Sequence, residues 1–188
     1  MGEIKKATLN QALVLKALAF AAEKHRFQFR KGEEQTPFIN HPIKVANLLT
    51  EVGLITDSAT ICGAILHDTI EDTITSCDEL KNLFGNEICS LVSEVSDDSL
   101  MKPAECKEHQ VDYAAMLSEK AKLIRLADKI ANVYDIAHFP PAHWNKQRRK
   151  EYLVWSKKVV DQIRGVNVLL DKKFDDVYFE ARKVLSLV

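Results

Sequence analysis

Hydrophobic residues recur every three to four positions over most of the chain, which is the spacing of amphipathic α-helices. No stretch alternates strictly between apolar and polar residues, as a half-buried strand would. The first predicted helix follows Thr8, a possible N-cap, and carries its apolar residues at positions 9, 12, 13, 17, 20 and 21. A second helix is expected to hold Pro42 in its first turn and to end at Gly53.

The helical pattern continues along the rest of the chain. Asp57 or Ser58 can cap a third helix, which runs into the segment AILHDTIEDT at residues 64–73. Residues 96–106 contain turn residues and Pro103, and therefore predict a surface loop. Further helices are predicted at residues 77–84, 86–95, 120–137, 147–170 and 174–186, with Pro140 and Pro141 as breakers.

The organisation of the chain predicts one domain. Its 188 residues are enough to bury a sizeable core. No Gly/Ser-rich linker, internal repeat or low-complexity segment divides them. We therefore expect an all-α fold, a helical bundle with a single domain over residues 1–188.

Composition and charge narrow the classes of function. The 26 basic and 27 acidic residues leave a formal net charge of -1, so the basic excess of a non-specific nucleic-acid binder is missing. No apolar run approaches the ~20 residues of a membrane span. The four cysteines are widely spaced without a C-x-x-C pair, which predicts reduced thiols in a cytoplasmic protein. Nucleic acid and membrane are thus not expected as partners, and the oligomeric state stays open.

A group of polar residues follows the apolar residues 64–66. On a continuous helix, Glu71 shares a face with His67 and Asp68, and Asp72 lies one turn after Asp68. Unpaired carboxylates at this density repel one another and resist burial. Because a divalent cation supplies the opposite charge, the stretch predicts a metal-binding pocket.

Two further segments offer ligands for such an ion. Asp128, Asn132 and Asp135 form a polar stripe on an otherwise apolar helix, and His41 stands at the start of the second predicted helix. Together these segments predict a site with two histidines and two aspartates: His41, His67, Asp68 and Asp128.

Each of these residues has a simpler interpretation when it is taken alone. A histidine–aspartate pair is often a surface ion pair, and a histidine at a helix start is often a cap. Asp128 can pair with Arg125 or Lys129. The combination H…HD…D with two more carboxylates one turn on is much harder to obtain by chance, and it favours the metal site.

Four segments carry a resemblance to a known family: KHRFQFRKGEEQTPFINHP, ILHDTIEDT, FGNEICSLVSEVSDD and KLIRLADKIANVYD. The H…HD…D pattern resembles that of HD-domain metal-dependent phosphohydrolases. The segments are similar to successive motifs of RelA/SpoT-type (p)ppGpp hydrolases, and most similar to their small stand-alone members. This resemblance extends over residues 12–165.

The resemblance implies an enzyme whose cofactor is a single Mn²⁺. Its ligands would be His41, His67, Asp68 and Asp128. Glu71 and Asp72 would flank the attacking water, and a carboxylate would take its proton. Attack on the 3′-phosphorus would release pyrophosphate and leave GDP or GTP. Nitrogen and oxygen ligands suit manganese or iron, although zinc would also bind.

The resemblance also implies a small-molecule nucleotide substrate. Its contacts would come from Arg30, Lys31, Asn132, Arg148 and Tyr152. Without the resemblance, the simplest interpretation of Arg30 and Lys31 is a pair of solvated loop charges, and that of Tyr152 is a half-buried aromatic residue.

The chain departs from the family pattern where a pyrophosphate would bind. Positions that are often basic in close relatives carry Ser99, Pro103, Cys106 and Glu108. Tyr134 replaces a common arginine, and Phe38 replaces a common tyrosine. We therefore expect fewer cationic contacts to a pyrophosphate than in a relative with the full basic loop.

Two other functions stay open. The same site could remove the 2′-phosphate of NADPH, as some small animal relatives do. Alternatively, the chain could be a nucleotide sensor without turnover, although a sensor has no need of Glu71 and Asp72.

Overall fold

The computed structural model describes residues 2–32, 34–98 and 100–186, with the backbone alone for residues 2–9. Over these ranges the only strand-like pairs are two isolated β-bridges. The all-α fold class is thereby confirmed, and no described helix has the length and apolarity that a membrane crossing needs. The helices are α1 (Gly2–Lys24), α2 (Asn40–Asn47), the π-helix η1 (Leu48–Val52), α3 (Ser58–Leu66), α4 (Thr69–Asp72), α5 (Cys77–Phe84), α6 (Asn86–Val95), α7 (Pro103–Tyr113), the 3-10 helix η2 (Ala114–Met116), α8 (Glu119–His138), α9 (Lys146–Asp161) and α10 (Val168–Val184).

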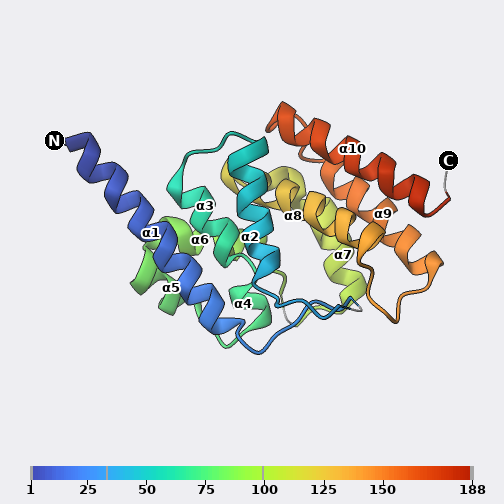
Figure 1. Cartoon of the computed structure of the whole chain (residues 1–188), viewed down its shortest axis with the longest axis horizontal. Helices are drawn as coiled ribbons and strands as arrows, with labels where there is room; N and C mark the ends of the chain where they lie inside the picture. Colours follow the sequence, from blue (N-terminus) through green and yellow to red (C-terminus); the bar gives the residue numbers. More distant parts are fainter. Residues whose placement is uncertain (1, 33, 99, 187–188) are drawn as a thin grey trace.

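Helix α8 is the central element, with α2 on one side and α9 and α10 on the other (Figure 1). It also packs against α3 and α6. Residues on nearly all sides of α8 are buried, including Ile124, Ala127 and Ala131. The polar stripe that begins at Asp128 is therefore enclosed by the core rather than placed on a solvent face.

Helix α2 forms a second wall of the enclosed region. Pro42 lies in its first turn, and the helical path continues through η1 to Val52 with Gly53 as the C-cap, as the sequence predicted. Val45 and Leu49 are fully buried. His41 and Lys44, one turn apart, make their contacts with α8.

Helix α3 forms a third wall and ends earlier than predicted. Asp57 is its N-cap, accepting a hydrogen bond from the Thr60 N–H at 2.9 Å. The continuous helix expected through residue 72 is wrong, because α3 ends at Leu66 and α4 begins at Thr69. The Thr69 hydroxyl donates to the Leu66 carbonyl at 2.6 Å, which satisfies a carbonyl at the end of α3. His67 and Asp68 therefore lie at a junction between two helices.

Other helix boundaries also differ from the prediction. Helix α1 begins at Gly2, so Thr8 is not its N-cap. The surface loop expected over residues 96–106 is wrong in its second half, because Pro103 starts α7. Proline is favoured at the first helical position, and the Glu105 carboxylate accepts a hydrogen bond from the Lys102 N–H at 3.1 Å.

The last two helices are divided at a different place from the one predicted. Helix α9 ends at Asp161 instead of residue 170, and α10 begins at Val168 instead of residue 174. Asn167 explains the division, because its side-chain oxygen accepts the N–H groups of Leu169 and Leu170. Its amide also donates to the Gly53 carbonyl at 2.9 Å, which ties α10 to the end of η1.

Cysteine pairing corrects another expectation. A disulfide joins Cys77, at the start of α5, to Cys89 in α6, where the sequence predicted only reduced thiols. The two helices pack against each other and bring these Cα atoms to 5.9 Å, within disulfide reach. Spacing along the chain does not reveal that contact. Cys62 is free and buried in the core, as predicted.

Candidate metal centre and active site

The four predicted metal ligands lie together at the meeting point of α2, α8 and the α3–α4 junction. The His41 Nε2 atom is 3.2 Å from Asp128 Oδ1 and 3.7 Å from Asp68 Oδ2. The His67 Nε2 atom is 3.0 Å from Asp68 Oδ1 and 3.8 Å from Asp128 Oδ1. His41, His67 and Asp128 are buried, and they form a group whose ligand atoms lie within 4.8 Å of one another.

The hydrogen bonds of His67 fit a metal ligand. Its Nδ1 atom lies 2.8 Å from the Ala64 carbonyl, which can only accept, so Nδ1 carries a proton. The Nε2 atom is buried and faces the cluster without a hydrogen bond among the described residues. Metal-bound histidines in proteins show this arrangement, in which a carbonyl fixes the ring and frees the other nitrogen. Two nitrogens and two carboxylates thus offer a donor set that fits a divalent cation.

The charges of the cluster also favour a cation. Burial lowers the pKa of His67, but the carboxylates of Asp68 and Asp128 outweigh it and raise the pKa to about 10. Burial raises the pKa of Asp128, but Lys129 and His41 outweigh it and hold the pKa well below its usual range. Burial also raises the pKa of Asp68, but His67 and His41 outweigh it and lower the pKa. The two aspartates therefore stay ionised, and a proton and a divalent cation compete for the same buried negative charge.

Glu71 and Asp72, the predicted catalytic carboxylates, lie on α4 at the rim of the cluster. The Glu71 Oε2 atom accepts a hydrogen bond from the Asp97 N–H at 3.1 Å. Burial of the carboxyl group raises the pKa of Glu71 to about 7, and the negative charges of Asp97 and Asp68 add to this effect. Burial and Asp68 also raise the pKa of Asp72. A carboxylate with a pKa near neutrality is suited to accept a proton from water.

Arg30 and Asn132, two of the predicted substrate contacts, are joined to the cluster by hydrogen bonds. The Arg30 guanidinium donates to Asn132 Oδ1 at 3.0 Å and to Asp135 Oδ2 at 2.9 Å. The Asn132 amide donates to Asp128 Oδ1 at 2.6 Å. Lys31 is exposed, and its carbonyl accepts the Ala142 N–H, which ties its loop to the segment between α8 and α9.

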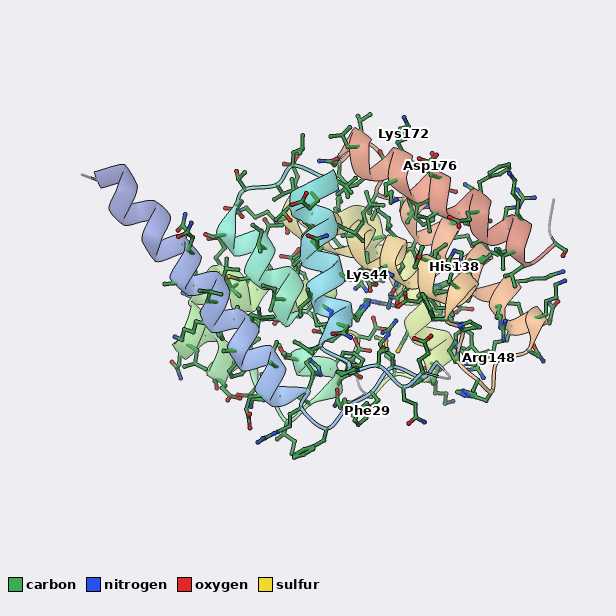
Figure 2. The ribbon with its side chains drawn as sticks, viewed as in Figure 1. Phe29, Lys44, His138, Arg148, Lys172 and Asp176 are labelled. Carbon is green, nitrogen blue, oxygen red and sulfur yellow. A yellow bond between two sulfur atoms is a disulfide. The ribbon has the colours of Figure 1, made fainter. Side chains whose placement is uncertain are left out.

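Of the two predicted contacts on α9, Tyr152 packs against neighbouring aromatic rings, whereas Arg148 is exposed. Tyr152 packs between Trp144 and Trp155, with ring centroids 5.5 and 5.2 Å away. Burial raises its pKa, and the nearby charge of Asp128 adds to this effect. Arg148 is exposed, lies in the first turn of α9 and stacks over Trp144, 4.5 Å from the ring centroid (Figure 2). The described residues show no contact between it and the four predicted ligands, so its role stays a prediction.

Some residues near the cluster were not singled out from the sequence. The Lys129 ammonium lies 3.2 Å from Asp128 Oδ2 and 4.3 Å from the Trp155 ring centroid, so the simple ion pair considered for Asp128 coexists with the cluster. Lys44 contacts Asp135 from α2. Its one-turn distance from His41 was the available signal, since both residues must then face the same side of the helix.

Comparisons with known proteins show which family the chain belongs to. A family model described as HD domain matches residues 17–157. Guanosine-3′,5′-bis(diphosphate) 3′-pyrophosphohydrolase MESH1 of Xenopus tropicalis is 44% identical over 169 residues, which are 90% of this chain and 94% of that protein. The MESH1 protein of Homo sapiens is 43% identical over 89% of this chain and 93% of its own length.

A solved structure of a related protein is similar to this chain in its fold as well as in its sequence. It is described as a metazoan orthologue of SpoT that hydrolyses ppGpp and plays a role in starvation responses. It matches with a TM-score of 0.87 and 43% identity, covering 89% of this chain and 94% of that one. The chain therefore belongs to the HD-domain family of phosphohydrolases and, within it, to the group of the MESH1 proteins.

Proposed function

We propose that this protein is a Mn²⁺-dependent 3′-pyrophosphohydrolase of (p)ppGpp that yields pyrophosphate and GDP or GTP. The convergence of two histidines and two aspartates from three helical segments carries the proposal. The names of the MESH1 relatives support the choice of substrate. Manganese is proposed because the mixed nitrogen and oxygen donor set suits it, with iron and zinc as competitors.

The chemistry divides between the metal centre and the carboxylates at its rim. When bound, a divalent cation supplies a Lewis acid that polarises a phosphoryl oxygen and lowers the pKa of water. Glu71 accepts the proton of the attacking water, and its Oε1 atom is available because Oε2 is held by the Asp97 N–H. The new bond forms from water oxygen to phosphorus, and the bond from phosphorus to the 3′-oxygen breaks. Asp72, the second rim carboxyl group, can deliver a proton to that leaving oxygen.

The arginine and the asparagine beside the cluster hold the substrate rather than react with it. Arg30 offers a planar guanidinium suited to phosphate oxygens. Asn132 lies between Arg30 and Asp128 and can exchange one of its hydrogen bonds for a substrate oxygen. Lys31, Arg148 and Tyr152 are proposed as further contacts at the rim and on α9.

A turnover assay across three substrates tests this proposal. Metal-loaded protein is incubated with ppGpp, pppGpp and NADPH, and the products are separated by anion exchange. We expect pyrophosphate in equal amount to GDP or GTP, and loss of turnover on chelation. Release of phosphate from NADPH without turnover of ppGpp would overturn the choice of substrate, whereas binding of ppGpp without turnover would identify a sensor.

The proposal extends to the organisation of the chain. Buried hydrophobic residues from Ala17 in α1 to Leu185 after α10 form one cluster, which supports a single domain over residues 1–188. The cytoplasmic location stays a prediction.

A further inference from the structure

Two cations share one carboxylate beside the candidate metal centre. The Lys44 ammonium donates to Asp135 Oδ1 at 2.7 Å, and the Arg30 guanidinium donates to Asp135 Oδ2 at 2.9 Å. Lys44 lies one turn after His41 on α2, and Asp135 lies two turns after Asp128 on α8. The pairing of helices that joins His41 to Asp128 therefore also brings Lys44 to Asp135.

The charges of this group do not cancel. In the described ranges, Asp135 is the single carboxylate within 4.0 Å of either cation. Two positive charges and one negative charge leave a net charge of about +1. Asn132 connects this group to the cluster, because it accepts from Arg30 and donates to Asp128. The excess positive charge thus adjoins the site where a phosphate would meet the metal.

Lys44 is held in place and can still be reached by a ligand. Its ammonium lies 4.0 Å from the centre of the Tyr134 ring, a cation–π contact that restricts the side chain. The side chain is 35% exposed, compared with 25% for Arg30. Figure 2 places Lys44 on the side of α2 that faces α8. A fixed, partly desolvated ammonium beside a guanidinium is suited to bind a phosphate oxygen.

We propose that Lys44 is a substrate-binding residue that, together with Arg30, binds a phosphate group of the substrate other than the one at the metal. This rests on the proposed function and deepens it, because it assigns a second anion subsite to the same candidate site. A 3′,5′-substituted nucleotide with two diphosphates has such additional phosphates, whereas a single phosphate ester would leave the subsite partly unused.

The first test separates binding from catalysis. Lys44→Met keeps most of the stem and removes the charge. We expect the KM for ppGpp to rise about tenfold or more, the usual worth of a charge-assisted hydrogen bond, with kcat nearly unchanged. Lys44→Arg keeps the charge and should restore KM. Lys172→Met is the matched control, since Lys172 is an exposed lysine on α10 that lies well away from Lys44 in Figure 2.

A second readout does not depend on turnover. The affinity of the metal-loaded protein for inorganic pyrophosphate is measured by calorimetry for the wild type and for Lys44→Met, Lys44→Gln, Lys44→Arg and Lys172→Met. We expect weaker binding in the Met and Gln variants alone, with a difference that shrinks at high salt. Melting temperatures show which variants fold. If Lys44→Met does not fold, Lys44→Gln is used in its place.

The outcomes distinguish this inference from the proposed function. If the wild type hydrolyses ppGpp while the neutral variants keep the wild-type KM and pyrophosphate affinity, Lys44 is not a substrate contact and the proposed function stands. If Lys44→Arg is as impaired as Lys44→Met, the positive charge is not what matters, and the inference is also wrong. If the wild type does not turn over ppGpp, the proposed function fails, and the pyrophosphate affinities still decide the role of Lys44.

Discussion

The candidate site has a metal end, formed by His41, His67, Asp68 and Asp128, and an anion end, formed by Arg30 and Lys44. The two ends differ in how firmly the surrounding structure holds their side chains. At the metal end, the His41, His67 and Asp128 side chains are 2%, 5% and 9% exposed and come from packed helices or from the junction between two of them. At the anion end, Arg30 lies on a loop and Lys44 is one-third exposed. Burial makes the metal end sensitive to any change of charge. From this comparison we expect that the metal end determines the reaction and that the anion end determines the affinity for the substrate and the choice of substrate.

Replacing the rim carboxylate tests whether the chemistry belongs to the metal end. Glu71→Gln keeps the size and the bond from the Asp97 N–H but cannot accept a proton. We expect kcat for ppGpp to fall by about 10²–10⁴, the usual worth of general-base catalysis, with KM and metal content almost unchanged. Glu151→Gln, an exposed change on α9, is the control. Unaltered kcat in Glu71→Gln would move the role of base to Asp72.

The pH dependence of kcat sharpens the same assignment. Glu71 must be ionised to accept a proton, and its pKa without a metal ion is about 7. A bound divalent cation lowers this pKa, so the midpoint should lie at or below about 7. Below the midpoint kcat should fall about tenfold per pH unit as Glu71 becomes protonated, and a second fall at higher pH would report the loss of the proton that Asp72 delivers. A profile measured from pH 5 to 9 should lose this acidic limb in Glu71→Gln, and a limb that persists would contradict the assignment.

Adding a positive charge beside the rim carboxylates should change affinity more than rate. Desolvation and the negative charges of Asp97 and Glu71 raise the pKa of the Cys106 thiol, so a cation at this position of α7 would interact with the Glu71 carboxylate. Cys106→Arg should therefore lower the KM for ppGpp by up to about fivefold. The new cation should also lower the midpoint of the pH profile, because it favours ionised Glu71.

Glu108→Arg on the same helix is the comparison for this variant. Glu108 lines a separate groove of about 600 Å³ between α7 and α9, together with Lys107 and Trp155. We expect a smaller change in KM than for Cys106→Arg. An equal effect of both variants, measured at two salt concentrations, would indicate general attraction of the substrate instead of a local contact.

Local sequence signals were enough to predict the bounds of helices that follow hydrophobic periodicity and end at a glycine. Helix α6 has the bounds predicted from periodicity, and Gly85 ends α5 with φ 89°. The predicted limits of α8 are correct to within one residue at each end. The grouping of His41, His67, Asp68 and Asp128 could also be anticipated, because buried carboxylates on apolar helices require a common partner.

The remaining features depend on contacts between segments that are distant in sequence. Asn167 divides α9 from α10 partly through its bond to Gly53, 114 residues away. The Cys77–Cys89 disulfide depends on how α5 packs on α6. The position of the Lys44 ammonium depends on its hydrogen bond to Asp135, which crosses the interface of α2 and α8. Periodicity along one segment contains no information about such partners, which is why the anion end was predicted less completely than the metal end.

The most direct test of the difference between the two ends is the metal content per chain, measured by elemental analysis of protein purified without chelator. Wild type and Lys44→Met should each carry about one divalent transition-metal ion per chain, as a single-metal site requires. Asp128→Ala should carry almost none and should lose turnover, because it removes a buried ligand. Wild-type protein that contains no metal and still hydrolyses ppGpp at full rate would contradict the assignment of the metal end.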